Sequence, residues 1–272
     1  MRLLVFGGSG MLGAEVVRIA QERGHTVESP PHQECEVFDF GAVADRVAWF
    51  SDGQPVDRII NCAGLVPAKI APDVGGTRAA FMTNTLGPLC LASFGVPLIH
   101  MSTDCVFSGT LQNRSYSADM APDPVDLYGR TKAAGEPIYF PNALTVRGSF
   151  IGPQHGFLRW LLDARGQVEA YVNARWSGTS SRRMAMELIA LAENWGHIDK
   201  PVIHAAPREP VSKAWMIEYL ADKLHLPIDI RLVREPTINR ALTPDYILPP
   251  VQEMLDDLVG QLQPQAVGGD PA

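Results

Sequence analysis

The sequence predicts an α/β protein built on a doubly wound parallel sheet, followed by a small C-terminal α/β lobe. Apolar strand-like runs alternate with helical stretches over the first 150 residues, which is typical of parallel βαβ units. A glycine-rich turn joins the first run to the first helical stretch. Beyond residue 150 the alternation loosens, and we therefore place the lobe there.

Each element has its own signal along the chain. Continuous apolar runs, suited to strands covered on both faces, predict strands at 2–6, 25–29, 58–64, 96–104, 143–148 and 202–206. Apolar residues at helical spacing predict helices at 11–24, 42–53, 78–95, 127–136, 156–166, 182–196, 213–226 and 249–263. We expect a first domain at 1–150, a lobe at 151–263 and a disordered tail at 264–272.

Composition narrows the class of protein. The 272 residues are 46% hydrophobic and 19% charged, with a net charge of −7, which argues against a partner made of nucleic acid. No run of about 18 apolar residues is present, so we expect no membrane span. The chain begins directly with a strand and shows no signal-peptide core, which favours a cytoplasmic protein. Four cysteines lack CxxC pairing and seven histidines lack metal-binding spacing, so we predict buried thiols and no metal.

The segment GGSGMLG at 7–13 leaves the first strand and opens the first helix. Gly7 and Gly10 would let backbone N–H groups approach a pyrophosphate, and Gly13 would allow the helix to pack closely on the strand. The helix N-terminus adds unpaired donors, and Met11 and Leu12 belong to the same turn. This predicts a Rossmann-type site for NAD or NADP, against the alternative of a glycine-rich turn that binds nothing.

The choice between the two cofactors stays open in the sequence. The second strand ends in ESPPH, which offers neither the aspartate that binds a ribose hydroxyl nor an arginine for a 2′-phosphate. We give NADPH a slight preference. Asp39, followed by Phe40, is positioned either to reach the adenine or to cap the next helix.

Tyr128 and Lys132 stand four residues apart in YGRTK and would lie on one face of a helix. An ammonium one turn away favours a phenolate, so we expect Lys132 to lower the pKa of Tyr128 and make it a useful acid. The alternative is a solvated helix face. For Thr103 and Asp104, in STD at the end of a strand, the alternative is a turn or helix cap.

The glycine loop, NCAG (61–64), STDCVFSG (102–109) and YGRTKAAGE (128–136), in this order, resemble the extended short-chain dehydrogenase/reductases. Within them the last two segments are most similar to the dTDP-4-dehydrorhamnose reductases. Weaker similarities to segments of the same family occur later in the chain, in VRGSFIG, IHAAPREPVSKAWMIEYLADKL and INRALTPDYI. Departures from the family pattern include Ala241, the segment WSGTSSRR and two prolines after Glu136.

The resemblance implies roles for individual residues. Lys132 would bind the nicotinamide ribose, Tyr128 would be the general acid, and Thr103 would hold the substrate carbonyl beside it. Further cofactor contacts would come from Ala63, Gly64, Leu65 and Ser102. Substrate contacts would come from Asp104, from Phe150 where the family has tryptophan, and from Arg240, which would grip a diphosphate unless it is a surface cation. Arg147 is interpreted as structural, at the edge of the sheet.

The function implied is an NAD(P)H-dependent reductase of a 4-keto-6-deoxy nucleotide sugar, in deoxysugar or polysaccharide biosynthesis. One alternative is an epimerase or dehydratase of the same superfamily, although such relatives are usually longer. Another is a non-catalytic, cofactor-binding regulatory subunit. A homodimer is compatible with each of these readings.

Overall fold

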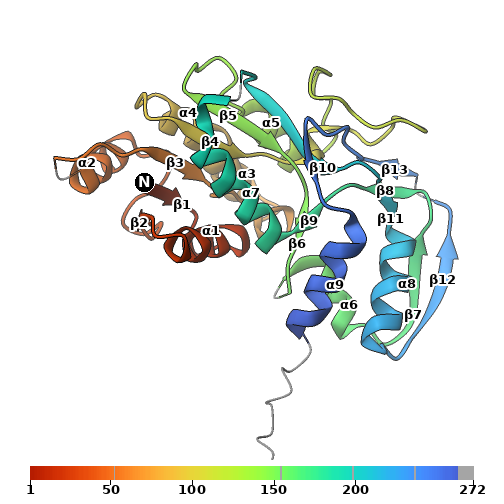
Figure 1. Ribbon diagram of the computed structural model, residues 1–272. Coiled ribbons are helices and arrows are strands. Elements are labelled where there is room, and N and C mark those ends of the chain that lie inside the picture. Colours follow the sequence, from red (N-terminus) through yellow and green to blue (C-terminus); the bar gives the residue numbers. More distant parts are fainter. Residues whose placement is uncertain (52, 154, 198, 236, 263–272) are drawn as a thin grey trace, which may run out of the picture.

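The computed structural model describes residues 1–51, 53–153, 155–197, 199–235 and 237–262 (Figure 1). The tail expected at 264–272 lies outside the described residues. A seven-stranded sheet has the order β14-β10-β5-β4-β3-β1-β2, and every pair in it is parallel. Its strands are β1 (Arg2–Phe6), β2 (Thr26–Glu28), β3 (Arg58–Asn61), β4 (Leu98–Met101), β5 (Ala143–Arg147), β10 (Val202–Pro207) and β14 (Tyr246–Leu248). The predicted doubly wound parallel sheet is confirmed.

Helices cover both faces of this sheet, as its buried apolar strands require. On one face α1 (Met11–Glu22) packs with α7 (Ser181–Glu193) over the largest apolar cluster. The other face carries α2 (Phe40–Ser51), α3 (Val74–Phe81), α4 (Gly87–Ala92) and α5 (Leu127–Ala134); Figure 1 shows α4 and α5 at the top and α2 at the left. α5 thus presents Tyr128 and Lys132 near the carboxyl ends of the central strands, where ligands bind in sheets of this kind.

The single helix expected at 78–95 is instead a longer, interrupted helical run. It begins at Val74, because the Asp73 carboxylate accepts a hydrogen bond from the Gly76 backbone N–H at 2.7 Å. A π-helical turn, Met82–Leu86, separates α3 from α4. Pro88 follows this turn at the start of α4, where the missing backbone donor costs little.

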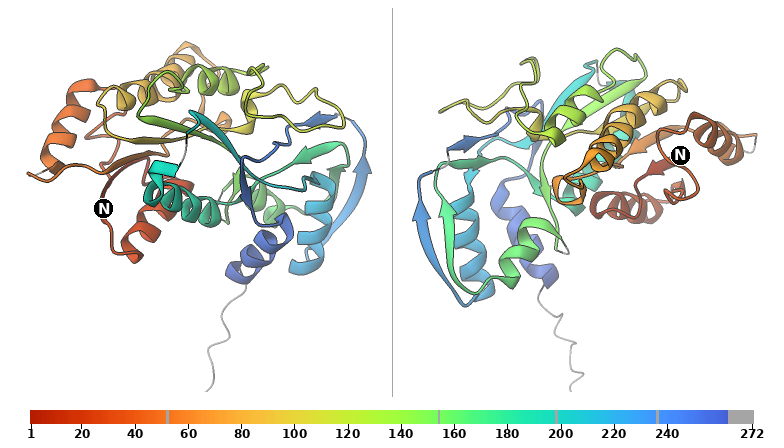
Figure 2. Two further views of the ribbon diagram at one scale, coloured as in Figure 1. Left: turned by 45° about the horizontal axis from the view of Figure 1, so that its top comes forward. Right: turned by 180° about the vertical axis from the view of Figure 1, so that it is seen from behind.

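The C-terminal lobe has its own apolar core between helices and short strands. Figure 2 shows α6 (Gly156–Asp163), α8 (Lys213–Leu224) and α9 (Val251–Leu262) grouped beside the large sheet. Three small sheets complete it: β7 (Gly166–Tyr171) with β12 (Ile228–Val233), β8 (Ala174–Trp176) with β11 (Val211–Ser212) and β13 (Ile238–Asn239), and β6 (Phe150–Ile151) with β9 (Thr179–Ser180).

Two strands of the large sheet, β10 and β14, come from the later part of the chain. The large sheet thus contains strands from both sides of residue 150, and the division of the chain into two domains at that residue stays a prediction. β5 lies between β4 and β10, so the placement of Arg147 at the edge of the sheet was wrong. Among the described residues, no helix is both long and apolar enough to cross a membrane.

Candidate functional site

The glycine loop is held in a conformation that side chains would prevent. Gly7 has φ +80°, and a Cβ there would meet the Ala63 backbone nitrogen at 2.5 Å. A Cβ on Gly13 would meet the Gly7 carbonyl oxygen at 2.1 Å, so α1 packs against the turn as predicted. Gly10, the residue before α1, has no side chain to cap the helix, which leaves N–H donors of the first turn for an anion.

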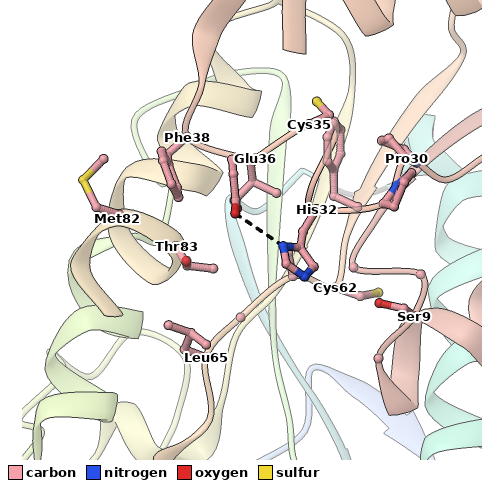
Figure 3. Close-up of a pocket in the computed structure, with 18 of the residues that line it drawn as sticks. Ser9, Pro30, His32, Cys35, Glu36, Phe38, Cys62, Leu65, Met82 and Thr83 are labelled. Atoms are coloured by element: carbon pink, nitrogen blue, oxygen red, sulfur yellow. Dashed lines mark ion pairs between the residues drawn. The ribbon is translucent and has the colours of Figure 1, made fainter. Parts of the chain in front are cut away.

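A cavity of about 1010 Å³ opens beside this loop. It lies at the carboxyl ends of β1, β2 and β3. In the sheet β1 has β2 on one side and β3 on the other, so the strand order reverses its direction at this point. Figure 3 shows Ser9 and Cys62 at one side of it, with Phe38, Met82 and Leu65 at the other. Its size and position match what a dinucleotide requires.

Five of the residues predicted to contact cofactor line this cavity, namely Gly7, Gly10, Ala63, Gly64 and Leu65. Leu12 is instead buried in the main core. Met11 packs against Gly152, where an added Cβ would meet its sulfur at 2.3 Å. Met11 and Leu12 thus pack against the protein interior and do not line the cavity.

Asp39 takes the alternative role considered for it. Its carboxylate accepts a hydrogen bond from the Ala42 backbone N–H at 3.0 Å, which caps α2. Phe40 is 60% exposed and stacks on Phe94 with ring centroids 4.6 Å apart. The cavity is lined just before these residues, by Glu36, Val37 and Phe38, and a cofactor contact from Asp39 or Phe40 stays a prediction.

The segment that follows β2 also lines the cavity, although the sequence did not predict it. Ser29, Pro30, Pro31 and His32 line the cavity, and the His32 Nδ1 lies 3.4 Å from a Glu36 carboxylate oxygen (Figure 3). The available signal was their position directly after a parallel strand, at the edge of the sheet where ligands bind. Lys69 and Arg78 add two cations to the lining.

Lys132 is almost fully buried, with 3% exposure. Its Nζ donates to the Met101 carbonyl oxygen at 2.8 Å and lies 3.4 Å from the Nε2 of His100. A Cβ on Gly64 would stand 4.0 Å from Nζ, so the ammonium lies directly behind the cavity wall. Burial lowers the pKa of Lys132 to about 8.

Tyr128 departs from the predicted electrostatics. Burial of its hydroxyl, reinforced by Cys105, raises its pKa above the ordinary value, whereas the sequence predicted a lowered pKa. The Lys132 Nζ is turned toward the Met101 carbonyl oxygen and His100, and the pKa of Tyr128 is raised in spite of the lysine on the same helix. The physical reason is desolvation, which disfavours the phenolate and which residue spacing does not report.

Tyr128, Thr103, Asp104 and Arg240 do come together. The Thr103 hydroxyl donates to Asp104 at 3.1 Å, and Arg240 lies 3.1 Å from the Cys105 sulfur. Burial raises the pKa of Asp104, while the Arg240 guanidinium opposes that rise. Arg240 also lies 3.6 Å from Asp126 and is mostly shielded from solvent, so it is not a free surface cation.

Ser102 and Phe150 have structural partners. The Ser102 hydroxyl donates to Glu136 at 2.7 Å, which turns it toward a buried ion pair with Arg147. Phe150 is partly buried and packs against the main core. Among the described residues, no group of three or more His, Cys, Asp or Glu side chains is arranged to hold a metal ion.

A parallel sheet of this order, a glycine loop opening on a dinucleotide-sized cavity and a tyrosine-lysine helix beside it define a short-chain dehydrogenase/reductase. The sequence model of the family described as RmlD substrate binding domain matches residues 1–240. The chain belongs to this family, which confirms the resemblance noted in the sequence.

Relatives of established name agree with this assignment. A dTDP-4-dehydrorhamnose reductase from Mycolicibacterium smegmatis is 30% identical over 218 residues, which is 75% of this chain and 64% of the relative. One from Mycobacterium tuberculosis is 30% identical over 232 residues, covering 78% and 72%. The chain thus spans slightly less than two thirds of the first relative. A solved dTDP-4-dehydrorhamnose reductase from Bacillus anthracis, in complex with NADP, superimposes with a TM-score of 0.81 at 17% identity, over 96% of this chain and 99% of the other.

Proposed function

We propose that this protein is an NAD(P)H-dependent reductase of a 4-keto-6-deoxy nucleotide sugar, in deoxysugar or polysaccharide biosynthesis. The observation that supports this most is the position of Lys132, directly behind the wall of the cavity at Gly64, on the helix that also bears Tyr128. A cofactor seated along the glycine loop would therefore reach the tyrosine-lysine helix. The M. smegmatis and M. tuberculosis relatives carry the name of such a reductase.

The residues present suit a dinucleotide. Small residues at Gly7, Gly8 and Gly10, with helix donors beside them, fit a pyrophosphate. Bound there, the reduced nicotinamide supplies the hydride that goes to the carbonyl carbon. Lys132, whose Nζ lies close to Gly64 in the cavity wall, would contact the nicotinamide ribose.

The protein itself would supply the proton. Tyr128 donates it to the carbonyl oxygen, and its raised pKa keeps the hydroxyl protonated until negative charge develops on that oxygen. Thr103 positions the same oxygen, and Asp104 shapes the pocket. Arg240, the residue that directly follows β13, is placed to bind a diphosphate, because a guanidinium fork matches phosphate oxygens.

NADPH is the preferred cofactor in this proposal. Glu28, the acid at the end of β2, pairs with Arg46 at 3.0 Å, so it is not free to accept a ribose 2′-hydroxyl. Ser29 and His32 line the cavity next to it and can donate to a phosphate. The B. anthracis relative was solved with NADP. Cytoplasmic location and homodimer formation stay predictions.

The test is a panel of nucleotide 4-keto-6-deoxy sugars, each assayed with NADH and with NADPH. We expect one reduced cofactor consumed for each sugar reduced, faster with NADPH. Sugar conversion without net cofactor consumption would replace the proposal with an epimerase or dehydratase. Tight NADPH binding without conversion of any sugar would favour the regulatory subunit.

A further inference from the structure

A chain of buried polar side chains runs behind the cavity, from Asn61 through His100 to Lys132. Asn61 and His100 are fully buried and Lys132 is 3% exposed. They come from β3, β4 and α5, so the large sheet and the catalytic helix meet here. Because water does not reach these groups, each donor needs an acceptor within the protein.

The backbone fixes the orientation of the Asn61 amide. The Ala63 backbone N–H, which can only donate, points at the Asn61 Oδ1 at 3.0 Å. The amide nitrogen Nδ2 must then face the other way, where it lies 3.1 Å from the His100 Nδ1. Since Nδ2 is a donor, the His100 Nδ1 is the acceptor and bears no proton.

This assignment fixes the tautomer of His100. Burial holds the pKa of His100 well below its ordinary value, and the neighbouring Lys132 lowers it further, so the imidazole is neutral. A neutral imidazole without a proton on Nδ1 carries it on Nε2. The Nε2–H therefore points at the Lys132 Nζ, 3.4 Å away.

An ammonium cannot accept that hydrogen bond. Charged Lys132 has three donors and no lone pair, so an N–H would face an N–H. A neutral amine has one lone pair for the His100 Nε2–H and keeps an N–H for the Met101 carbonyl oxygen at 2.8 Å. The two arrangements differ by one satisfied hydrogen bond between buried groups.

The other groups facing Lys132 support the charged form only in part. Glu136 and Cys62 favour the ammonium, but burial outweighs both of them. Glu136 is already bound to Arg147 and Ser102. Burial also raises the pKa of Cys62 to about 12, so this thiol is neutral and offers no negative charge near pH 7.

We propose that His100, held by Asn61 as the Nε2–H tautomer, donates a hydrogen bond to Lys132 and stabilises its neutral amine. His100 is a positioning residue that acts through Lys132. The Lys132 ammonium is then a stronger acid than the ammonium of an ordinary lysine.

NMR of the cofactor-free protein tests this without any assay of activity. The chain has five lysines, Lys69, Lys132, Lys200, Lys213 and Lys223, so labelled side-chain signals are few enough to separate. Lys132→Arg identifies the Lys132 signal by its loss. We expect the Lys132 amine to titrate well below the ordinary lysine value and the 15N shifts of His100 to report a proton on Nε2 alone.

His100→Gln is the decisive variant, because the amide oxygen of glutamine can accept from an ammonium. We expect the Lys132 titration midpoint to rise by about one unit or more. The matched control is His204→Gln, since His204 is also fully buried but lies on β10 with its Nδ1 at 3.1 Å from the Tyr116 carbonyl oxygen. The control should leave the midpoint in place.

Two results would overturn the inference. One is a wild-type protein whose 15N shifts show that His100 carries its proton on Nδ1; this result does not depend on whether any variant folds. The other is a Lys132 midpoint unmoved in folded His100→Gln. Neither depends on the substrate: an inactive protein with the expected NMR signals would contradict the proposed function and leave this inference standing.

Discussion

Arg147 and Glu136 form a two-pronged ion pair in the interior, with Nη2–Oε2 at 2.7 Å and Nε–Oε1 at 2.9 Å. The pair joins the end of β5 to the residues after α5, and the Ser102 hydroxyl after β4 donates to the same carboxylate. Both side chains are about 4% exposed or less. The pair therefore holds the helix that bears Tyr128 and Lys132 against the carboxyl edge of the sheet.

Removing one member of this pair should destabilise the fold severely. Arg147→Met leaves the Glu136 carboxylate buried without its cation, and breaking a buried pair in this way costs about 3–5 kcal/mol. Urea unfolding measures the loss. Arg159→Met is the control, because its partner Asp163 is exposed on one face of α6 and the unfolding midpoint should stay close to wild type. A midpoint unchanged in Arg147→Met would show that the pair does not hold the helix.

A methyl group at Gly13 should remove the cofactor site. The added Cβ would meet the Gly7 carbonyl oxygen at 2.1 Å, and backbone cannot move aside as a flexible side chain can. We expect Gly13→Ala to lower NADPH affinity by at least about tenfold, roughly 1.4 kcal/mol, measured by fluorescence titration. Gly260→Ala, also within a helix but facing open space, should bind as wild type does. If Gly13→Ala bound NADPH with wild-type affinity, the cavity beside the glycine loop would not be the cofactor site.

The large sheet and the glycine loop could be predicted because their causes are local. A run such as Leu3–Phe6 is apolar because both faces of β1 are covered, and Gly13 is required by a backbone contact with Gly7 within the same turn. The short strands of the lobe, such as β11 with two residues, have no comparable pattern. They form because the lobe packs around its own core.

The electrostatics of the site could not be predicted from spacing. The interval between Tyr128 and Lys132 places them on one face of α5, but the partners of the lysine, Met101 and His100, come from β4. Burial then sets the direction of both pKa shifts. Asp39 shows the same limit, because an acid after an extended stretch suits a helix cap as well as a ligand.

Tyr128→Phe should abolish reduction of the sugar while leaving NADPH affinity within about threefold of wild type. Only the hydroxyl that gives the proton is removed, and the ring still fills its place beside Thr103 and Cys105. Single-turnover measurement of cofactor oxidation separates this loss from slow product release. Tyr139→Phe serves as the control, because Tyr139 is 92% exposed and should turn over normally. Reduction at the wild-type rate in Tyr128→Phe would assign the proton to another group.

Because its pKa is lowered, Lys132 should make the free energy of unfolding depend on pH in a range where an ordinary lysine has no such effect. Its folded-state pKa is about 8, below the ordinary 10.5, so between these values the unfolded chain binds more protons than the folded one. Stability from this group therefore rises as pH rises through the window and is lowest below about pH 8. A shift of this size corresponds to about 3 kcal/mol.

Lys132→Met removes the titrating group, so its stability relative to wild type should fall by up to about 3 kcal/mol from pH 8 to pH 10.5. Urea unfolding of both proteins at several pH values measures the difference, in which the titrations of Cys105 and other shared groups largely cancel. Lys200→Met is the control with the opposite sign. The hydrogen bond from Lys200 to Asp245 raises the pKa of Lys200, so its contribution is lost, not gained, as pH rises through that pKa. A constant difference between Lys132→Met and wild type would mean that the buried lysine titrates in the folded protein as it does in the unfolded chain.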